Sequence, residues 1–349
     1  MGPARWGRGS AREAALALAA LLLVSCGPAH ARGTPPADSA PAVARRAGRA
    51  ARIAPRVSIG GRDVGGLGPA AARSAVQALA AELDVPALDA RIEADTRGLV
   101  PGVDGVKLDV EATLARLLTA KAGASVAPAL RPVPPAVPMA ALPPRPIYHA
   151  SRQRHAVAFA INVAWGDLSL PSMLDTLKRL RAPATFCLVG RWAESHPDTV
   201  HAIVANGQAA GTPYAFCNHG YRDHGWQGLG EAQAAASIAQ ADQVIERLTG
   251  QKPLVFSPHK GEFNNAVLQA SRAQGHPLVL WSVDTIDWQN PTPQGIIQRV
   301  LSRVGPGDIV LMHPTPSTAE ALAALIAGVR AKGLRLVTLN QLLSPSGAA

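Results

Sequence analysis

The stretch Val157-Ala-Phe-Ala-Ile-Asn162 is an unbroken apolar run that ends in a polar side chain. Similar runs recur after it, separated by segments with helical spacing, and this alternation is typical of a parallel sheet covered by helices. The runs predict strands at 156–161, 184–189, 254–256, 278–283, 308–312 and 334–339. Helices are predicted at 171–181, 199–206, 231–248, 266–274, 294–303 and 319–331. We therefore predict an α/β fold over residues 149–345 whose sheet is closed or nearly closed.

Polar side chains cluster at the ends of five of the predicted strands. The clusters are Asn162 with Asp167, Asn218 to His224, Ser257 to Gly261, Asp284 to Trp288, and His313. A single histidine at a strand end is more often structural than a ligand. Because parallel strands of a barrel bring their carboxyl ends together, the clusters taken together indicate a functional site.

Several motifs occur in a fixed order within this region. They are Trp165-Gly-Asp167, Ala184-Thr-Phe186, Asn218-His-Gly-Tyr221, Trp281-Ser-Val-Asp-Thr-Ile-Asp-Trp288 and Ile309-Val-Leu-Met-His-Pro314. In this order they resemble the polysaccharide deacetylase family, also known as the NodB-homology domain, and especially its sporulation-associated branch. The resemblance covers nearly all of residues 149–343 and implies a distorted (β/α) barrel.

The resemblance implies metal-dependent hydrolysis of N-acetyl amide bonds in a cell-wall polysaccharide. A divalent ion, usually zinc, is held by one Asp and two His; it polarises the acetyl carbonyl and activates a water molecule. A second Asp accepts the proton of that water, and a late His protonates the departing amine. An Arg orients the base Asp, and a further Asp tunes the late His.

The motifs that carry these roles are incomplete at the first strand and intact at the last. Asn162 stands at the position of the base, and Val163 at that of the metal-binding Asp. An amide does not accept a proton at neutral pH, and an aliphatic side chain does not ligate a cation. Ser257 replaces the orienting Arg, whereas Asp287 and His313 match the family pattern.

A rearranged metal site is one interpretation of the remaining polar residues. His219 matches the first metal histidine, but Asp223 stands where the second is usual, and His224 follows one residue later. Asp167 is kept in a variant Trp-Gly-Asp motif. The predicted metal ligands are therefore Asp167, His219 and His224, a set that suits zinc.

The predicted site supports two hypotheses. Its catalytic residues would be His313, Asp287 and Asn162, and its substrate-binding residues Trp165, His259, Trp281 and Trp288. Aromatic faces suit sugar rings, although core packing is the more common use of a buried tryptophan. The first hypothesis is a hydrolase with a degenerate or rearranged metal site. The alternative is a catalytically inactive protein of the same fold that binds glycan or serves as an envelope scaffold.

The first 54 residues are typical of export. Arginines precede an apolar run at 14–24 that is too short to span a bilayer but matches a signal peptide, predicted at residues 1–31. Leu23-Val-Ser-Cys26 resembles a lipobox, which would place a lipid on Cys26 and anchor the protein to a membrane. Ala29-His-Ala31 is an alternative cleavage site for secretion. Residues 32–54 are predicted to be a basic linker.

The middle of the chain is predicted to hold a small α+β module at residues 55–122. Its Gly-Gly-x-Asp-Val-Gly-Gly-Leu pattern resembles a peptidoglycan-binding module, with a spacer as the alternative. Residues 123–148 are predicted to be a proline-rich linker. The net charge of +10 suits binding to an anionic surface. We do not expect nucleic-acid binding, because the sequence has no basic helix interleaved with aromatic residues. Cys187 and Cys217 allow one disulfide, although the apolar run around Cys187 favours a buried free thiol.

Overall fold

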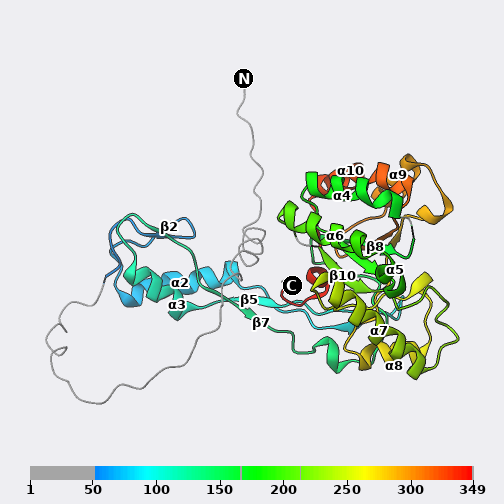
Figure 1. Cartoon of the computed structure of the whole chain (residues 1–349). Coiled ribbons are helices and arrows are strands. Elements are labelled where there is room, and N and C mark those ends of the chain that lie inside the picture. Colours follow the sequence, from blue (N-terminus) through cyan, green and yellow to red (C-terminus); the bar gives the residue numbers. More distant parts are fainter. Residues whose placement is uncertain (1–51, 166, 213, 348–349) are drawn as a thin grey trace, which may run out of the picture. The chain divides into compact units, whose positions relative to one another are not determined.

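The computed structural model describes residues 52–165, 167–212 and 214–347, which fold into two compact units. Unit 1 comprises residues 52–88 and 104–134, and unit 2 comprises 89–103 and 135–347 (Figure 1). The predicted signal peptide, Cys26 and most of the predicted basic linker lie outside the described residues. Within the described ranges, no helix has the length and apolar character needed to cross a membrane.

Unit 1 is an α+β module in which two helices pack together. Helix α2 begins with a proline at its first turn, and helix α3 begins where the Asp109 side chain accepts the Ala112 N–H at 2.9 Å. Val76 and Leu117 are fully buried in the core between these helices and the strands. The elements are β1 Ser58–Ile59, β2 Arg62–Asp63, α2 Pro69–Leu83, β5 Gly105–Leu108, α3 Val110–Thr119, β6 Ser125–Val126 and β7 Leu130–Val133.

The structure corrects the predicted linker at residues 123–148. Its first part belongs to unit 1, because strand β6 pairs with β1 and strand β7 pairs antiparallel with β5. Proline suggested an extended spacer, but Pro132 is tolerated in β7, which pairs with β5 on one side and is the edge strand of this sheet among the described residues. The second part packs on unit 2, where Ile147 is buried and bridges Val279.

Two further boundaries differ from the prediction. Ile53, assigned to the basic linker, is buried in unit 1, and its N–H donates to the Leu67 carbonyl. Residues 89–103, assigned to the small module, belong to unit 2 as the hairpin of β3 Arg91–Ile92 and β4 Leu99–Val100. A polar contact helps to hold this hairpin in unit 2, because Oε2 of Glu93 lies 3.0 Å from Nε2 of the buried His149.

A parallel sheet forms the centre of unit 2. Its order is β10-β9-β8-β12-β11, and β13 also pairs with β8. The strands are β8 Ala156–Val163, β9 Thr185–Leu188, β10 Ala215–Asn218, β11 Val283–Asp284, β12 Ile309–Met312 and β13 Arg335–Val337. Beyond β10, Phe256 bridges Asn218 on one side and Leu278 on the other. Because residues 278–284 run on from that bridge into β11, they join the two ends of the sheet into a distorted barrel.

Helices cover the outside of this barrel. Figure 1 shows α4, α9 and α10 together on one side, and α7 and α8 together on another. The helices are α4 Leu170–Arg179, α5 Gly190–Ser195, α6 Pro197–Ala210, α7 Glu231–Thr249, α8 Asn265–Ala273, α9 Pro293–Leu301, α10 Pro316–Ala331 and α11 Leu339–Leu343. The predicted α/β barrel is thus confirmed, although the sequence analysis did not predict β10, α5 or α11.

The central strand β8 divides its side chains between two layers. Phe159 and Ile161 are fully buried among residues of the covering helices. Ala158 and Ala160 lie in a second cluster with the two cysteines and with leucines of α11. Alternation along a strand places Asn162 on the same face as these alanines, at the carboxyl end of β8.

Candidate active site

Polar side chains converge at the carboxyl ends of the barrel strands. Asn162 lies near the end of β8, and His219 directly follows β10. His259 follows the bridge at Phe256, and His313 directly follows β12. The histidines influence one another electrostatically, since the charge states of His259 and His313 both act on His219. The five predicted polar clusters therefore meet at one end of the barrel.

His313 is held by a buried carboxylate. Its Nδ1 lies 2.7 Å from Oδ1 of Asp287, and its main-chain N–H donates to Oδ2 at 2.6 Å. Asp287 is fully buried and starts the 3-10 helix Asp287–Gln289, after Ile286 in a left-handed conformation. This arrangement fixes the imidazole orientation, as the family resemblance implies for a proton-donating histidine.

Trp165 lies over the ring of His313. The two ring centres are 5.5 Å apart and the planes differ by 9°. Trp165 is 42% exposed and Trp288, beside Asp287 in the chain, is 54% exposed, so both present aromatic surface to solvent. Trp281 is half-buried and packs between two interior clusters. The exposed faces of Trp165 and Trp288 are therefore the better candidates for sugar contact.

His219 is buried and neutral. Nδ1 lies 2.5 Å from the carbonyl oxygen of Ser257, which can only accept, so Nδ1 carries the proton and Nε2 carries the lone pair. Burial, together with the charges of His259 and His313, lowers the pKa of His219 to about 3, although the bond to Ser257 opposes this shift. Nε2 of His219 can therefore accept a hydrogen bond or bind a metal at neutral pH.

His259 occupies the place beside His219. The two ring centres are 5.5 Å apart in an edge-on arrangement. Nε2 of His259 lies 2.5 Å from Oδ1 of Asp223, and its Nδ1 is buried with no partner among the described residues. Burial lowers the pKa of His259, Asp223 opposes that shift, and Lys260 and His313 add to it.

The first strand lacks the groups that the family resemblance implies. Asn162 is buried, and its Oδ1 has no hydrogen-bond partner in the described part of the chain. Val163 is fully buried in the layer between the sheet and the helices. Ser257, in place of the orienting Arg, is also buried and serves His219 through its carbonyl.

The predicted metal ligands do not assemble as a set among the described residues. His224 packs against Trp226 with ring centres 5.4 Å apart, and its Nδ1 lies 3.1 Å from the Gly225 carbonyl oxygen. His259, rather than His224, is in ring contact with His219. Asp167 begins the 3-10 helix Asp167–Ser169, and its side chain lies outside the described structure. Over residues 52–347, the described side chains include no group of three His, Cys, Asp or Glu that could hold a metal ion, so they do not fit a three-ligand zinc site.

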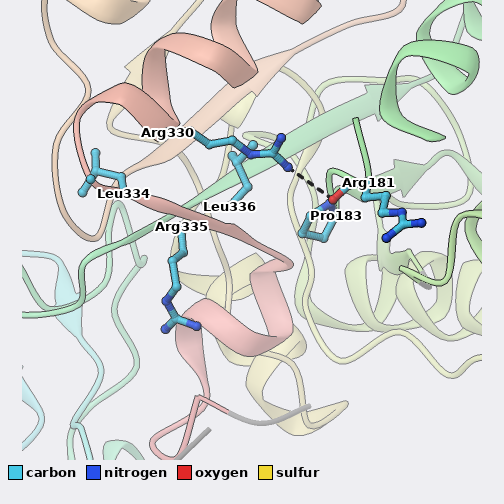
Figure 2. Close-up of a pocket in the computed structure, with 7 residues that line it drawn as sticks. Arg181, Pro183, Arg330, Leu334, Arg335 and Leu336 are labelled. Atoms are coloured by element: carbon cyan, nitrogen blue, oxygen red, sulfur yellow. Dashed lines mark hydrogen bonds between the residues drawn. The ribbon is translucent and has the colours of Figure 1, made fainter. Parts of the chain in front are cut away.

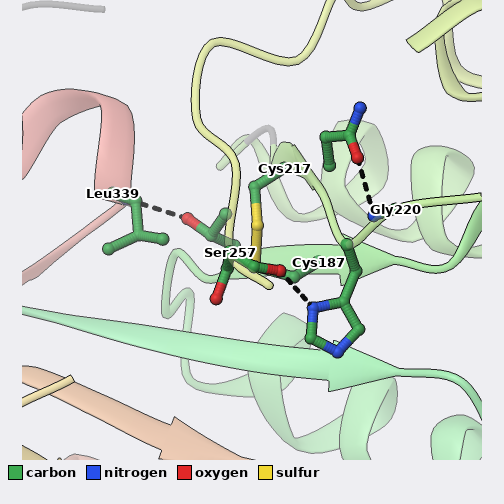
Figure 3. Close-up of a disulfide and its surroundings, with 8 residues drawn as sticks. Cys187, Cys217, Gly220, Ser257 and Leu339 are labelled. Atoms are coloured by element: carbon green, nitrogen blue, oxygen red, sulfur yellow. Dashed lines mark hydrogen bonds between the residues drawn. A yellow bond between two sulfur atoms is a disulfide. The ribbon is translucent and has the colours of Figure 1, made fainter. Parts of the chain in front are cut away.

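A disulfide joins Cys187 and Cys217 beneath the site (Figure 3). The two cysteines are opposite each other in the register of β9 and β10, with Cα atoms 4.3 Å apart. This corrects the expectation of a buried free thiol, which rested on the apolar run around Cys187. Ser257, labelled beside the disulfide in Figure 3, connects this region to the site through its bond to His219.

Two partners in the site were not predicted from the sequence. The hydroxyl of Thr318 donates to Oδ2 of Asp287 at 2.6 Å, and Asp223 pairs with His259. Asp223 could have been suspected, because it occupies a family histidine position. Thr318 gave no comparable signal, since it lies in the first turn of α10 and outside the quoted motifs.

Comparisons with known proteins identify the family of this chain. The family model of polysaccharide deacetylases matches residues 151–279, and that of a peptidoglycan-binding domain matches residues 68–125. The uncharacterized protein YlxY of Bacillus subtilis is 34% identical over 264 residues, which cover 76% of this chain and 81% of YlxY. The chain belongs to the polysaccharide deacetylase family. This confirms the family predicted from the ordered motifs.

Other members of the polysaccharide deacetylase family differ in activity. A peptidoglycan-N-acetylglucosamine deacetylase of Bacillus cereus is 32% identical over 181 residues, covering 50% of this chain and 64% of that enzyme. The crystal structure of a CE4 family pseudoenzyme from Bacillus anthracis superposes with a TM-score of 0.66 at 30% identity, covering 78% of this chain and 95% of that one. A mutant of that pseudoenzyme, described as having restored enzymatic activity, superposes equally well, with a TM-score of 0.66.

Proposed function

We propose that this polysaccharide deacetylase-like protein binds N-acetylated cell-wall glycan at the carboxyl ends of its barrel strands and lacks the metal-assisted hydrolysis of active relatives. The observation that carries the proposal is the paired loss at the end of β8. Among the described residues, the buried amide oxygen of Asn162 has no partner where a base is needed, and Val163 is fully buried in the apolar core. The pseudoenzyme from Bacillus anthracis, 30% identical to this chain, supports the same interpretation.

The site retains groups that suit a sugar. Asn162 Oδ1 and His259 Nδ1 are buried acceptors without partners among the described residues, and His219 Nε2 bears a lone pair. Glycan hydroxyl and acetamido N–H groups are donors that could satisfy these acceptors, and unsatisfied buried groups are costly. Trp165 and Trp288 add exposed aromatic faces of the kind that stack on sugar rings.

Hydrolysis through a rearranged site is the second candidate function. The intact Asp287–His313 pair favours it, because that pair would supply the proton to a departing amine. It requires Asp167 to join His219 and His224 around a divalent ion, most simply zinc. When bound, the ion would polarise the acetyl carbonyl. Among the residues that the structure describes, no such set is formed, so we rank this candidate second.

The experiment is to measure binding of N-acetylglucosamine oligomers and of their deacetylated counterparts to the purified full-length chain. Binding that prefers the acetylated oligomer, with no acetate released in the presence of zinc, is the expected result. Trp288→Ala should weaken binding about tenfold, whereas Leu254→Ala, an equally exposed apolar residue, should not. Acetate release that disappears in His219→Ala would overturn the proposal in favour of the second candidate.

We also propose that the protein is exported and anchored by a lipid on Cys26. The Cys187–Cys217 disulfide supports an oxidising compartment. The match of a peptidoglycan-binding domain to residues 68–125 supports wall contact by unit 1. Cys26→Ala should move the protein from the membrane fraction to the soluble fraction, because the residue that carries the lipid anchor is removed. Retention of Cys26→Ala in the membrane fraction would contradict the lipid anchor.

A further inference from the structure

A basic pocket lies at the amino-terminal end of the barrel strands. It has a volume of about 480 Å³ and is lined by Arg181, Pro183, Arg330, Gly333, Leu334, Arg335 and Leu336 (Figure 2). Pro183 precedes β9, and Arg335 is the first residue of β13, which pairs with the first residue of β8. His219 and His313 of the deacetylase-like site follow the opposite, carboxyl ends of strands β10 and β12. The pocket is therefore separate from the deacetylase-like site.

The two segments that form the pocket carry only positive charge. Residues 178–183 and 330–336 contain six Lys or Arg and no Asp or Glu: Lys178, Arg179, Arg181, Arg330, Lys332 and Arg335. All six are exposed. Like charges held close together repel, so such a cluster is less favourable without a bound anion.

The three pocket arginines differ in what they bind within the protein. Nη2 of Arg330 donates to the carbonyls of Leu180 at 2.8 Å and Arg181 at 3.3 Å, which ties α10 to the end of α4. Among the residues that the structure describes, the guanidinium groups of Arg181 and Arg335 meet no hydrogen-bond or ion-pair partner. A structural role thus accounts for Arg330, while Arg181 and Arg335 are left for a ligand.

Arg181 adopts a backbone conformation that favours glycine. It lies two residues beyond Arg179, the last residue of α4, and its φ of 46° is in the left-handed region. The equivalent positions after α8 and α10 are Gly275 and Gly333, with φ of 82° and 73°. A side chain at such a position is strained, and strain of this kind is often found where the side chain has a function.

We propose that this pocket binds a phosphodiester-linked polyanion. A guanidinium group can donate two parallel N–H bonds to the oxygens of one phosphate. The residues that line the pocket include no carboxylate that would compete for these donors. In Figure 2 the side chains of Arg181, Arg330 and Arg335 extend in different directions rather than toward one point. Arg181 and Arg335, the two that are left for a ligand, therefore suit separate phosphates along one chain better than a single ion. Leu334 and Leu336 provide an apolar floor for the linking carbons.

The test measures binding of poly(glycerol phosphate) to the full-length chain at low and moderate salt. The variant is Arg181→Gly combined with Arg335→Gln. Glycine suits the left-handed backbone at position 181, so the fold should be kept or stabilised. The variant loses two guanidinium groups. The control is Lys107→Gln with Arg131→Gln, which removes the same charge from an exposed strand pair in unit 1.

The expected result is binding that weakens about tenfold or more in the pocket variant and by less than about twofold in the control. The unfolding temperature of Arg181→Gly should be equal to or above that of the wild type. Equal weakening in both variants, or no binding by the wild type, would overturn the proposal. Inorganic phosphate that competes as well as the polymer would indicate a single-ion site instead. Binding only to phosphatidylglycerol vesicles would indicate a membrane surface, and either outcome contradicts a polyanion site.

Discussion

The hydroxyl of Thr318 lies 2.6 Å from Oδ2 of Asp287, although 31 residues separate the two in the chain. Oδ1 of the same carboxylate faces Nδ1 of His313 at 2.7 Å. Asp287 has no exposed surface, and a buried carboxylate is tolerated only when donors replace its water. The bond from Thr318 therefore links the start of α10, through Asp287, to the imidazole that follows β12, and holds this part of the site in place.

Removing that hydroxyl should destabilise the barrel. Thr318→Val keeps the shape of the side chain but deletes a donor to a buried charge, which is worth about 1.5–3 kcal/mol in the free energy of unfolding. Urea denaturation measures the change. Ser317→Ala, one residue earlier in the same helix, should alter stability by less than about 0.5 kcal/mol. Equal values for the two variants would show that Asp287 does not depend on Thr318.

The buried His219 should make stability depend on pH. Its pKa is lowered from 6.5 to about 3 in the folded chain. Between these values the unfolded chain binds a proton that the folded chain does not, so stability is complete above pH 6.5 and falls as the pH is lowered. From pH 7 to pH 5 the loss from this group is on the order of 2 kcal/mol.

His219→Asn tests this dependence. The asparagine amide can still donate to the Ser257 carbonyl but does not titrate, so the fall in stability between pH 7 and pH 5 should become smaller. His201→Gln, on the exposed surface of α6, should leave the slope as in the wild type. Unfolding curves at several pH values provide the measurement. An unchanged slope in His219→Asn would assign the pH dependence to other groups, with His259 as the next candidate.

The fold was largely predictable because its central strands are continuous apolar runs. Strands β8, β9 and β12 were predicted from sequence to within about two residues at each end. Strand β10 was missed because Ala215-Phe-Cys-Asn218 is short and contains one strong strand former. The proline-rich segment was misassigned because pairing of β7 with β5 depends on contacts distant in sequence. Composition alone carries no such information.

The site was predictable by residue type but not by partner. Asp287, His219 and His313 lie where strand order placed them, since parallel strands share one end. His259 lies beside His219 where His224 was predicted. This outcome depends on how the loop after β10 folds, because His224 packs in that loop against the fully buried Trp226. The disulfide depends on strand register, because Cys187 and Cys217 are directly opposite only when β9 and β10 pair as they do.

Removing the disulfide should cost stability without abolishing the fold. The 30-residue separation of Cys187 and Cys217 corresponds to about 3–4 kcal/mol in a chain-entropy treatment of the unfolded state. Wild-type protein should therefore unfold at lower urea with dithiothreitol than without it. The double variant Cys187→Ala with Cys217→Ala should unfold like the reduced wild type, and dithiothreitol should not affect it. Sensitivity of the double variant to dithiothreitol would contradict the pairing.

Restoring the two absent ligands should create a zinc-dependent protein. The family resemblance places the metal Asp at Val163 and the second metal His at Asp223, so the variant is Val163→Asp with Asp223→His. Without metal it should be about 3–5 kcal/mol less stable than the wild type, because the new carboxylate replaces a fully buried valine. Zinc in large excess over its dissociation constant should raise the free energy of unfolding of this variant by about 4 kcal/mol.

Thermal unfolding with zinc and with a chelator measures this linkage. The same variant carrying His219→Ala is the control, and it should lose the zinc effect because a third ligand is removed. Adding Asn162→Asp should then permit acetate release, since the base is restored and the Asp287–His313 pair is intact. A variant that zinc does not stabilise would show that Val163 does not occupy the position of the metal ligand.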